Sequence, residues 1–93
     1  MLNKNILKIR KELDNLDNSL LILIKKRIQL VDNVLKNKKY KKDIIDRKRI
    51  KVILRNIKNK STKKNIDPII TRRIWTSMIR SFIDYEFRNF NKK

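Results

Sequence analysis

The chain contains no cysteine and no histidine. Without cysteine it can form neither a disulfide framework nor a thiolate metal site. Without histidine it lacks the usual general base and the commonest metal ligand. Any catalysis must therefore use arginine, lysine, aspartate, glutamate and hydroxyl groups, which favours electrostatic stabilisation over proton shuttling.

Glycine is also absent, and Pro68 is the only proline among the 93 residues. A chain with so few helix breakers and so many leucines, isoleucines and lysines favours long helices over strands and tight turns. Its length suits one domain, near the lower limit for a self-sufficient core. The sequence therefore predicts an all-α fold in a single domain, residues 1–93.

Long apolar runs are missing as well. The longest, Leu20–Ile24, is far too short to span a bilayer. The lysine-rich start is soon followed by Glu12, Asp14 and Asp17, without the apolar core and small-residue cleavage site of a signal peptide. We expect no targeting peptide, no membrane partner and a cytoplasmic location.

Positive charge is abundant: 27 basic residues against 9 acidic ones give a formal charge of +18. Such a charge is typical of proteins that bind nucleic acid or anionic membranes. The basic residues are, however, spread along the whole chain, and lysine, asparagine and isoleucine dominate together, as an A+T-rich genome would impose. We therefore expect no nucleic-acid partner. A basic helical dimer that binds nucleic acid is the alternative.

The segment from Ile6 to about Lys38 has the apolar spacing of one long amphipathic helix, roughly 50 Å in length. A compact domain of this size has a radius of gyration of only about 12 Å. The helix therefore cannot bury its apolar stripe within its own subunit, which predicts a homodimer. The stripe consists of Ile6, Ile9, Leu13, Leu16, Leu20, Leu23, Ile24, Val31, Val34 and Leu35.

A second helix follows a polar connector at residues 39–42. Asp43 or Asp46 can cap this helix, which should end near Lys60. A polar loop should then occupy residues 58–65. The apolar positions of the helix form one stripe: Ile50, Ile53, Leu54 and Ile57.

The third helix has the sharpest start signal, because Asp67 can cap it and Pro68 suits its first position. It should run to about Phe90. Its inward stripe reads Ile74 or Trp75, then Met78, Ile79, Phe82, Glu86 and Phe90. Glu86 stands where an apolar residue belongs, so it must be paired with a cation, protonated, or exposed by fraying of the helix end. The functional interpretation is that Glu86 faces the same cavity as Lys38.

Three cations could act together on a small dianion. Arg10 and Arg27 lie 17 positions apart, so they are about 25 Å apart along the helix and cannot grip one small ligand from the same chain. In an antiparallel pair, Arg10 of one chain could approach Arg27 of the other. Arg27 and Lys38, eleven positions apart, should share one face within about 20° and could clamp a dianion.

Together these features resemble the all-helical chorismate mutase family over nearly the whole chain. The matching pieces are Ile9–Asp17, Leu20-Leu21, Arg27, Lys38 at the family's spacing, Asp46-x-x-Arg49, and Asp67-Pro68 before a helix that ends in an inward glutamate. The resemblance implies an intertwined, helix-swapped homodimer with two equal active sites and no metal or cofactor. The reaction it implies is the rearrangement of the dianion chorismate to prephenate, in phenylalanine and tyrosine biosynthesis.

The resemblance also implies roles for individual residues. Arg10 would reach into the partner's site and bind one substrate carboxylate, and Arg27 would hold the other. Lys38 would contact a carboxylate and the ether oxygen of the breaking C–O bond. Glu86, at a position where the family has glutamine or sometimes glutamate, would donate a hydrogen bond to that oxygen.

On the second helix, the resemblance makes Asp46 the aspartate that contacts the ring-hydroxyl region of the substrate. Arg49 matches the arginine that the family carries on this helix. Asp43 and Arg47 offer a competing match one turn earlier.

Two substrate-binding positions depart from the usual pattern. Ile50 stands where many members have a glutamate that binds the ring hydroxyl, and Phe82 stands where many have a serine. Apolar or bulky residues at these positions also occur in relatives that act as isochorismate pyruvate lyases. An isochorismate pyruvate lyase, which forms salicylate, is therefore the alternative function on the same scaffold.

Overall fold

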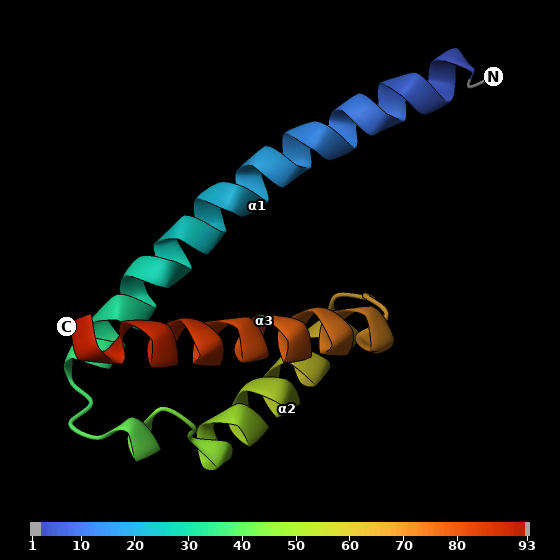
Figure 1. The fold of residues 1–93 in the computed structure, drawn as a ribbon. Helices are drawn as coiled ribbons and strands as arrows, with labels where there is room; N and C mark the ends of the chain where they lie inside the picture. The colour runs from blue at the N-terminus through green and yellow to red at the C-terminus, as the bar shows by residue number, and fades with distance from the viewer. Residues whose placement is uncertain (1–2, 93) are drawn as a thin grey trace. The chain divides into compact units, whose positions relative to one another are not determined.

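The computed structural model describes residues 3–92, and the described part of the chain is helical and contains no strand (Figure 1). This confirms the expected all-α fold. The chain divides into two compact units, Met1–Leu30 and Val31–Lys93. The elements are α1 (Lys4–Lys36), η1 (Lys41–Asp43), α2 (Arg47–Lys63), α3 (Pro68–Asn89) and η2 (Phe90–Lys92), where η denotes a 3₁₀ helix.

Helix α1 is continuous over 33 residues, as its apolar spacing predicts. Asn3 precedes it, and the Asn3 Oδ1 atom accepts a hydrogen bond from the Ile6 backbone N–H at 2.9 Å. This bond satisfies one of the amide groups that the first turn of a helix leaves without a partner. At 1.5 Å per residue the helix is about 50 Å long.

The C-terminal end of α1 comes earlier than expected. The helix ends at Lys36, and the Asn37 side-chain amide donates to the Asn33 carbonyl at 2.8 Å. Asparagine side chains can bind nearby backbone groups in this way, and such a bond competes with continuation of the helix. Lys38 lies beyond the helix, so the expectation that Lys38 and Arg27 share one face of a continuous helix is wrong.

Most large apolar side chains of the first unit are exposed to solvent, whereas Ile28 is half-buried. Leu20–Ile24 are five consecutive examples, each between 43 and 63% exposed. Because successive helical positions lie 100° apart, these five residues surround the whole helix. The full set is Ile6, Leu7, Ile9, Leu13, Leu16, Leu20, Leu21, Ile22, Leu23, Ile24 and Leu30.

The connector between α1 and α2 is longer and more ordered than predicted. It contains the 3₁₀ turn η1, and Asp43 Oδ2 accepts a hydrogen bond from the Tyr40 backbone N–H at 3.2 Å. Ile44 follows, and with Leu35 it makes up the buried apolar core of the described residues. Asp46 then caps α2, since its Oδ1 atom accepts from the Arg49 N–H at 3.0 Å.

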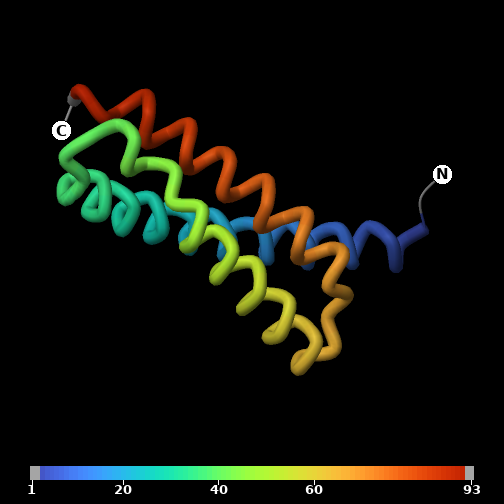
Figure 2. The backbone as a smooth tube through the Cα atoms, turned by 90° about the horizontal axis from the view of Figure 1, so that it is seen from below, coloured from blue at the N-terminus to red at the C-terminus, as the bar shows by residue number. Residues whose placement is uncertain are grey.

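Helices α2 and α3 form a hairpin and lie side by side (Figures 1 and 2). Helix α2 continues to Lys63, so the predicted loop at residues 58–65 is wrong over most of its length. Ser61 explains the difference: its hydroxyl is buried and lies 2.7 Å from the buried hydroxyl of Thr71 on α3. Some of the polar residues that predicted a loop therefore belong to the last turns of α2, where Ser61 faces α3.

The turn after α2 uses an asparagine where most proteins use glycine. Asn65 has a φ of 58°, in the left-handed region. The Ile66 N–H donates to the Ser61 carbonyl at 2.9 Å and the Asn65 N–H to the Thr62 carbonyl at 3.2 Å. This is the Schellman pattern, which closes the carbonyls of the last turn. In a chain without glycine, asparagine is the residue that best tolerates this conformation.

We expect Asn65→Ala to lower the free energy of unfolding by about 1 kcal/mol, because alanine tolerates the left-handed region less well. In a domain of this size that corresponds to a fall in Tm of roughly 4–8 °C. Thermal unfolding followed by circular dichroism, at one fixed protein concentration, measures it. Asn59→Ala, the same change at an exposed position inside α2, should cause no fall. Equal losses in the two variants would contradict the assignment.

Helix α3 begins as predicted. Pro68 is its first residue, and Asp67 Oδ1 accepts from the Ile69 N–H at 2.9 Å. Its inward stripe contains Trp75 rather than Ile74, which is 51% exposed. Half-buried Met78, Ile79 and Phe82 follow, then buried Glu86 and half-buried Phe90.

Candidate active site

A partly buried ion pair lies among the described residues of the second unit. The Lys38 Nζ atom donates to Glu86 Oε1 at 3.0 Å, and the two side chains are only 18% and 8% exposed. Glu86 comes from the last turns of α3, and Lys38 from the connector just after α1. The pair therefore supplies the cation that a carboxylate at this inward position requires.

The connector also holds the Lys38 ammonium from a second side. Lys38 Nζ donates to the Ile44 carbonyl at 3.4 Å. Because the Ile44 side chain is buried, this stretch of backbone is anchored in the unit. A positive charge held in this partly buried position interacts more strongly with a nearby anion than an exposed lysine does.

Three of the predicted residues lie at the start of α2. The exposed Asp46 uses its Oδ1 atom to cap the helix on the Arg49 N–H, so its position is set by the helix itself. The Arg49 side chain is exposed, while Ile50 is half-buried. The competing residue Asp43 lies in η1 instead, where it accepts from Tyr40. The substrate-binding roles of Asp46, Arg49 and Ile50 stay predictions.

Phe82 lies one turn before Glu86 on α3 and is half-buried. Side chains four positions apart on a helix are neighbours. A bulky aromatic ring, instead of a small hydroxyl, therefore stands next to the Glu86 carboxylate on this helix. Its effect on substrate choice stays a prediction.

Arg10 and Arg27 both belong to α1 within the first unit. Arg10 is exposed and Arg27 is half-buried. Since α1 is continuous, the two lie about 25 Å apart along its axis, as their spacing predicts. One chain therefore cannot apply both arginines of this helix to one small ligand. The structure brings Lys38 and Glu86 together inside the second unit.

Sequence reasoning missed a second polar contact beside the ion pair. The Tyr85 hydroxyl donates to Asp32 Oδ1 at 2.7 Å, which joins α3 to the last turns of α1. The hydrogen bond to Asp32, then burial, then the Asp32 charge raise the pKa of Tyr85, because ionisation would remove the donated proton; Arg88 has the opposite effect. No spacing rule connects residues 53 positions apart, so only the fold could reveal this contact.

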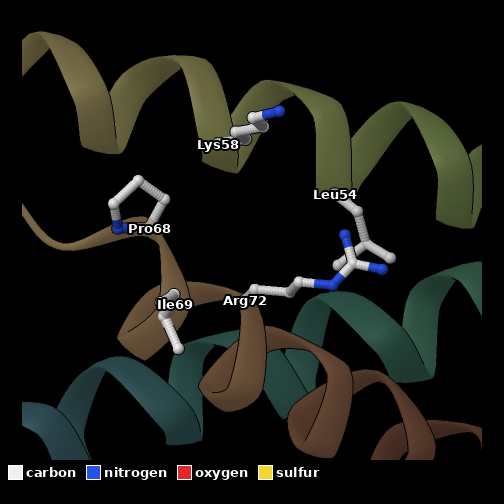
Figure 3. Close-up of a pocket in the computed structure, with 5 residues that line it drawn as sticks. All are labelled: Leu54, Lys58, Pro68, Ile69 and Arg72. Carbon is white, nitrogen blue, oxygen red and sulfur yellow. The ribbon is translucent and has the colours of Figure 1, made fainter.

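A separate pocket lies between α2 and α3 near their connecting turn (Figure 3). It includes none of the predicted site residues. Two cations border it and no carboxylate does, so its lining differs from the Lys38–Glu86 pair. The lining residues are Leu54, Lys58, Pro68, Ile69 and Arg72.

A comparison of the sequence with known protein families identifies the family of this chain. A family model described as chorismate mutase type II matches residues 9–87, well over half of the chain. The chain therefore belongs to the chorismate mutase type II family. Comparisons with curated proteins and with solved structures gave no significant match. No helix within residues 3–92 is long and apolar enough to cross a membrane.

Proposed function

We propose that this protein is a chorismate mutase, which rearranges chorismate to prephenate in phenylalanine and tyrosine biosynthesis. The observation that carries the proposal is the partly buried Lys38–Glu86 pair, in a chain of the chorismate mutase type II family that has neither histidine nor cysteine. The residues available can stabilise charge, and this reaction needs little else.

The rearrangement is unimolecular and requires no acid–base step, metal or cofactor. The protein must hold a compact conformer of the substrate and stabilise the negative charge that grows on the ether oxygen. Lys38 Nζ and Glu86 Oε1 are 3.0 Å apart, so both can reach one oxygen atom placed beside them. Lys38 would supply charge, and protonated Glu86 would supply a hydrogen bond.

Arg27 and Arg10 would bind the two substrate carboxylates. Because α1 separates these side chains by about 25 Å, a site that uses both needs two chains. An antiparallel partner could place its Arg10 near Arg27 of the first chain. The proposed active site is therefore shared between protomers, with two equal sites in a homodimer.

The exposed apolar surface of α1 supports this dimer. Each leucine or isoleucine side chain buried against a partner would contribute roughly 1.5–3 kcal/mol. One straight partner helix would cover a single face, but Leu20–Ile24 are exposed on every side of α1. An interlocked, helix-swapped arrangement, in which several partner elements surround α1, fits this distribution better than a simple pair of helices.

A second candidate function is an isochorismate pyruvate lyase. The half-buried, apolar Ile50 and Phe82 favour it, because neither can hydrogen-bond a substrate hydroxyl. The same cations would bind either dianion. Ile50 and Phe82, the two residues that depart from the usual family pattern, would contact the substrate ring. A measurement of turnover with each substrate therefore distinguishes the two functions.

Incubation of the purified protein with chorismate and, separately, with isochorismate tests the proposal. Prephenate from chorismate supports the mutase, whereas salicylate and pyruvate from isochorismate support the lyase. Turnover of neither compound, together with tight DNA binding that weakens steeply with salt, would support a nucleic-acid-binding dimer instead.

The activity should fall as the pH rises, because Glu86 must be protonated to donate to the ether oxygen. The dependence of kcat/KM on pH measures this effect. Glu86→Gln, which donates at every pH, should give a flatter profile. A flat wild-type profile would argue against this role of Glu86.

A further inference from the structure

Two adjacent residues of α3 contact the end of α1 and the connector that follows it. Tyr85 donates to Asp32 at 2.7 Å, and Glu86 accepts from Lys38 at 3.0 Å. All four residues lie in the second unit, Val31–Lys93. Only the second contact involves groups that the proposed reaction uses.

The two contacts hold α3 in different directions. Adjacent helical residues lie 100° apart around the axis, so one contact alone permits rotation about it and two together oppose that rotation. Their partners also lie in different elements. Asp32 lies within helix α1, whereas Lys38 has a long side chain on the connector beyond the helix end. The two contacts therefore join α3 to two different parts of the second unit.

Neighbouring groups hold the Tyr85 ring and backbone. The Arg88 guanidinium lies over the ring, 5.9 Å from its centroid, and Arg88 Nε also donates to Asp84 at 2.8 Å. The Asn89 side-chain amide donates to the Tyr85 carbonyl at 2.8 Å. The hydroxyl of Tyr85 is thus directed at Asp32 from a ring with contacts on its C-terminal side.

We propose that the Tyr85–Asp32 hydrogen bond sets the rotation of α3 and thereby directs the Glu86 carboxyl group at the reacting ether oxygen. This inference rests on the proposed mutase function. Tyr85 is a positioning residue, because it acts through Glu86. Its loss lowers kcat more than it raises KM, since the proposed carboxylate-binding arginines lie on α1 and not on α3.

The variant that tests the proposal is Tyr85→Phe, which removes one oxygen atom and keeps the ring. We expect kcat for chorismate to fall about tenfold with KM within about twofold, as small displacements of a reacting group can cost up to about 10²-fold. Tyr40→Phe is the matched control, because Tyr40 is the other tyrosine of the chain and is 60% exposed. It should leave both constants unchanged.

A second comparison separates positioning of Glu86 from a general loss of structure. In a Glu86→Ala background there is no carboxyl group to direct, so adding Tyr85→Phe should leave kcat unchanged. If Tyr85→Phe lowers kcat by the same factor in both backgrounds, Tyr85 does not act through Glu86 and the proposal is wrong. Circular dichroism checks that each variant keeps its helical content.

The contact can also be measured without a substrate. In Tyr40→Phe only Tyr85 can ionise as a phenol, and absorbance titration should give a pKa above the ordinary tyrosine value. Adding Asp32→Asn should return this pKa toward that value. An ordinary pKa before that change would overturn the contact itself. Wild-type protein that makes no prephenate would overturn the proposed function, whereas active wild type with an equally active Tyr85→Phe variant would overturn only the positioning role.

Discussion

Lys38→Ala should lower kcat/KM for chorismate by at least about 10²-fold, the scale for loss of one group that stabilises transition-state charge. Lys38 is the half-buried cation that meets Glu86 at 3.0 Å, and no water or exposed lysine would replace a charge held in this position. Because the charge on the ether oxygen grows during the reaction, the loss should appear mainly in kcat. Steady-state kinetics measures the two constants separately.

The control is Lys39→Ala at the next, exposed position. It removes the same charge from the long-range field that attracts an anionic substrate, so it should change kcat/KM only slightly. Lys38→Ala also leaves the buried Glu86 without its cation, a cost that can reach about 3–5 kcal/mol for fully buried pairs and is smaller for a partly exposed one.

The double variant Lys38→Ala/Glu86→Gln removes that uncompensated charge and should fold. It should remain at least about 10²-fold less active than Glu86→Gln alone. If the double variant is as active as Glu86→Gln, or Lys38→Ala retains most of the wild-type activity, Lys38 has no role in the chemistry.

Local physics explains what the sequence could predict. The helical period of the apolar residues identified α1, and the Asp67-Pro68 start signal identified the first turn of α3. Glu86 was found by the same reasoning, because a carboxylate in an apolar stripe needs a partner. Each of these conclusions depends on residues close together in the chain or on one helix face.

Contacts between distant segments account for what the sequence could not predict. In the sequence Ser61 indicates a loop, and only the fold shows that its hydroxyl contacts Thr71 across the hairpin. Likewise, the sequence gives no sign that Tyr85 donates to Asp32. The early end of α1 is a local exception. The Asn37 residue could either continue the helix or bind the Asn33 carbonyl with its side chain. The spacing of apolar residues does not distinguish these two conformations.

Mixing Arg10→Ala and Arg27→Ala proteins, each inactive alone, should restore about one quarter of the wild-type activity. At a 1:1 ratio about half of the dimers are mixed, and each mixed dimer has one intact site of two. The intact site takes Arg27 from the Arg10→Ala chain and Arg10 from the Arg27→Ala chain. The second site lacks both arginines. Prephenate formation is measured after mass spectrometry has shown that subunits exchange.

The proposed shared site predicts which pairs of variants restore activity when mixed. If Arg10 served its own chain's site, both sites of every mixed dimer would lack one arginine and no activity would return. Arg27→Ala mixed with Lys38→Ala is the matched control, since the proposed site takes both residues from the same chain and every mixed site would lack one. Recovery in the first mixture and not in the second would support a pocket completed across the interface. Equal recovery in both mixtures, or none in either despite exchange, would exclude it.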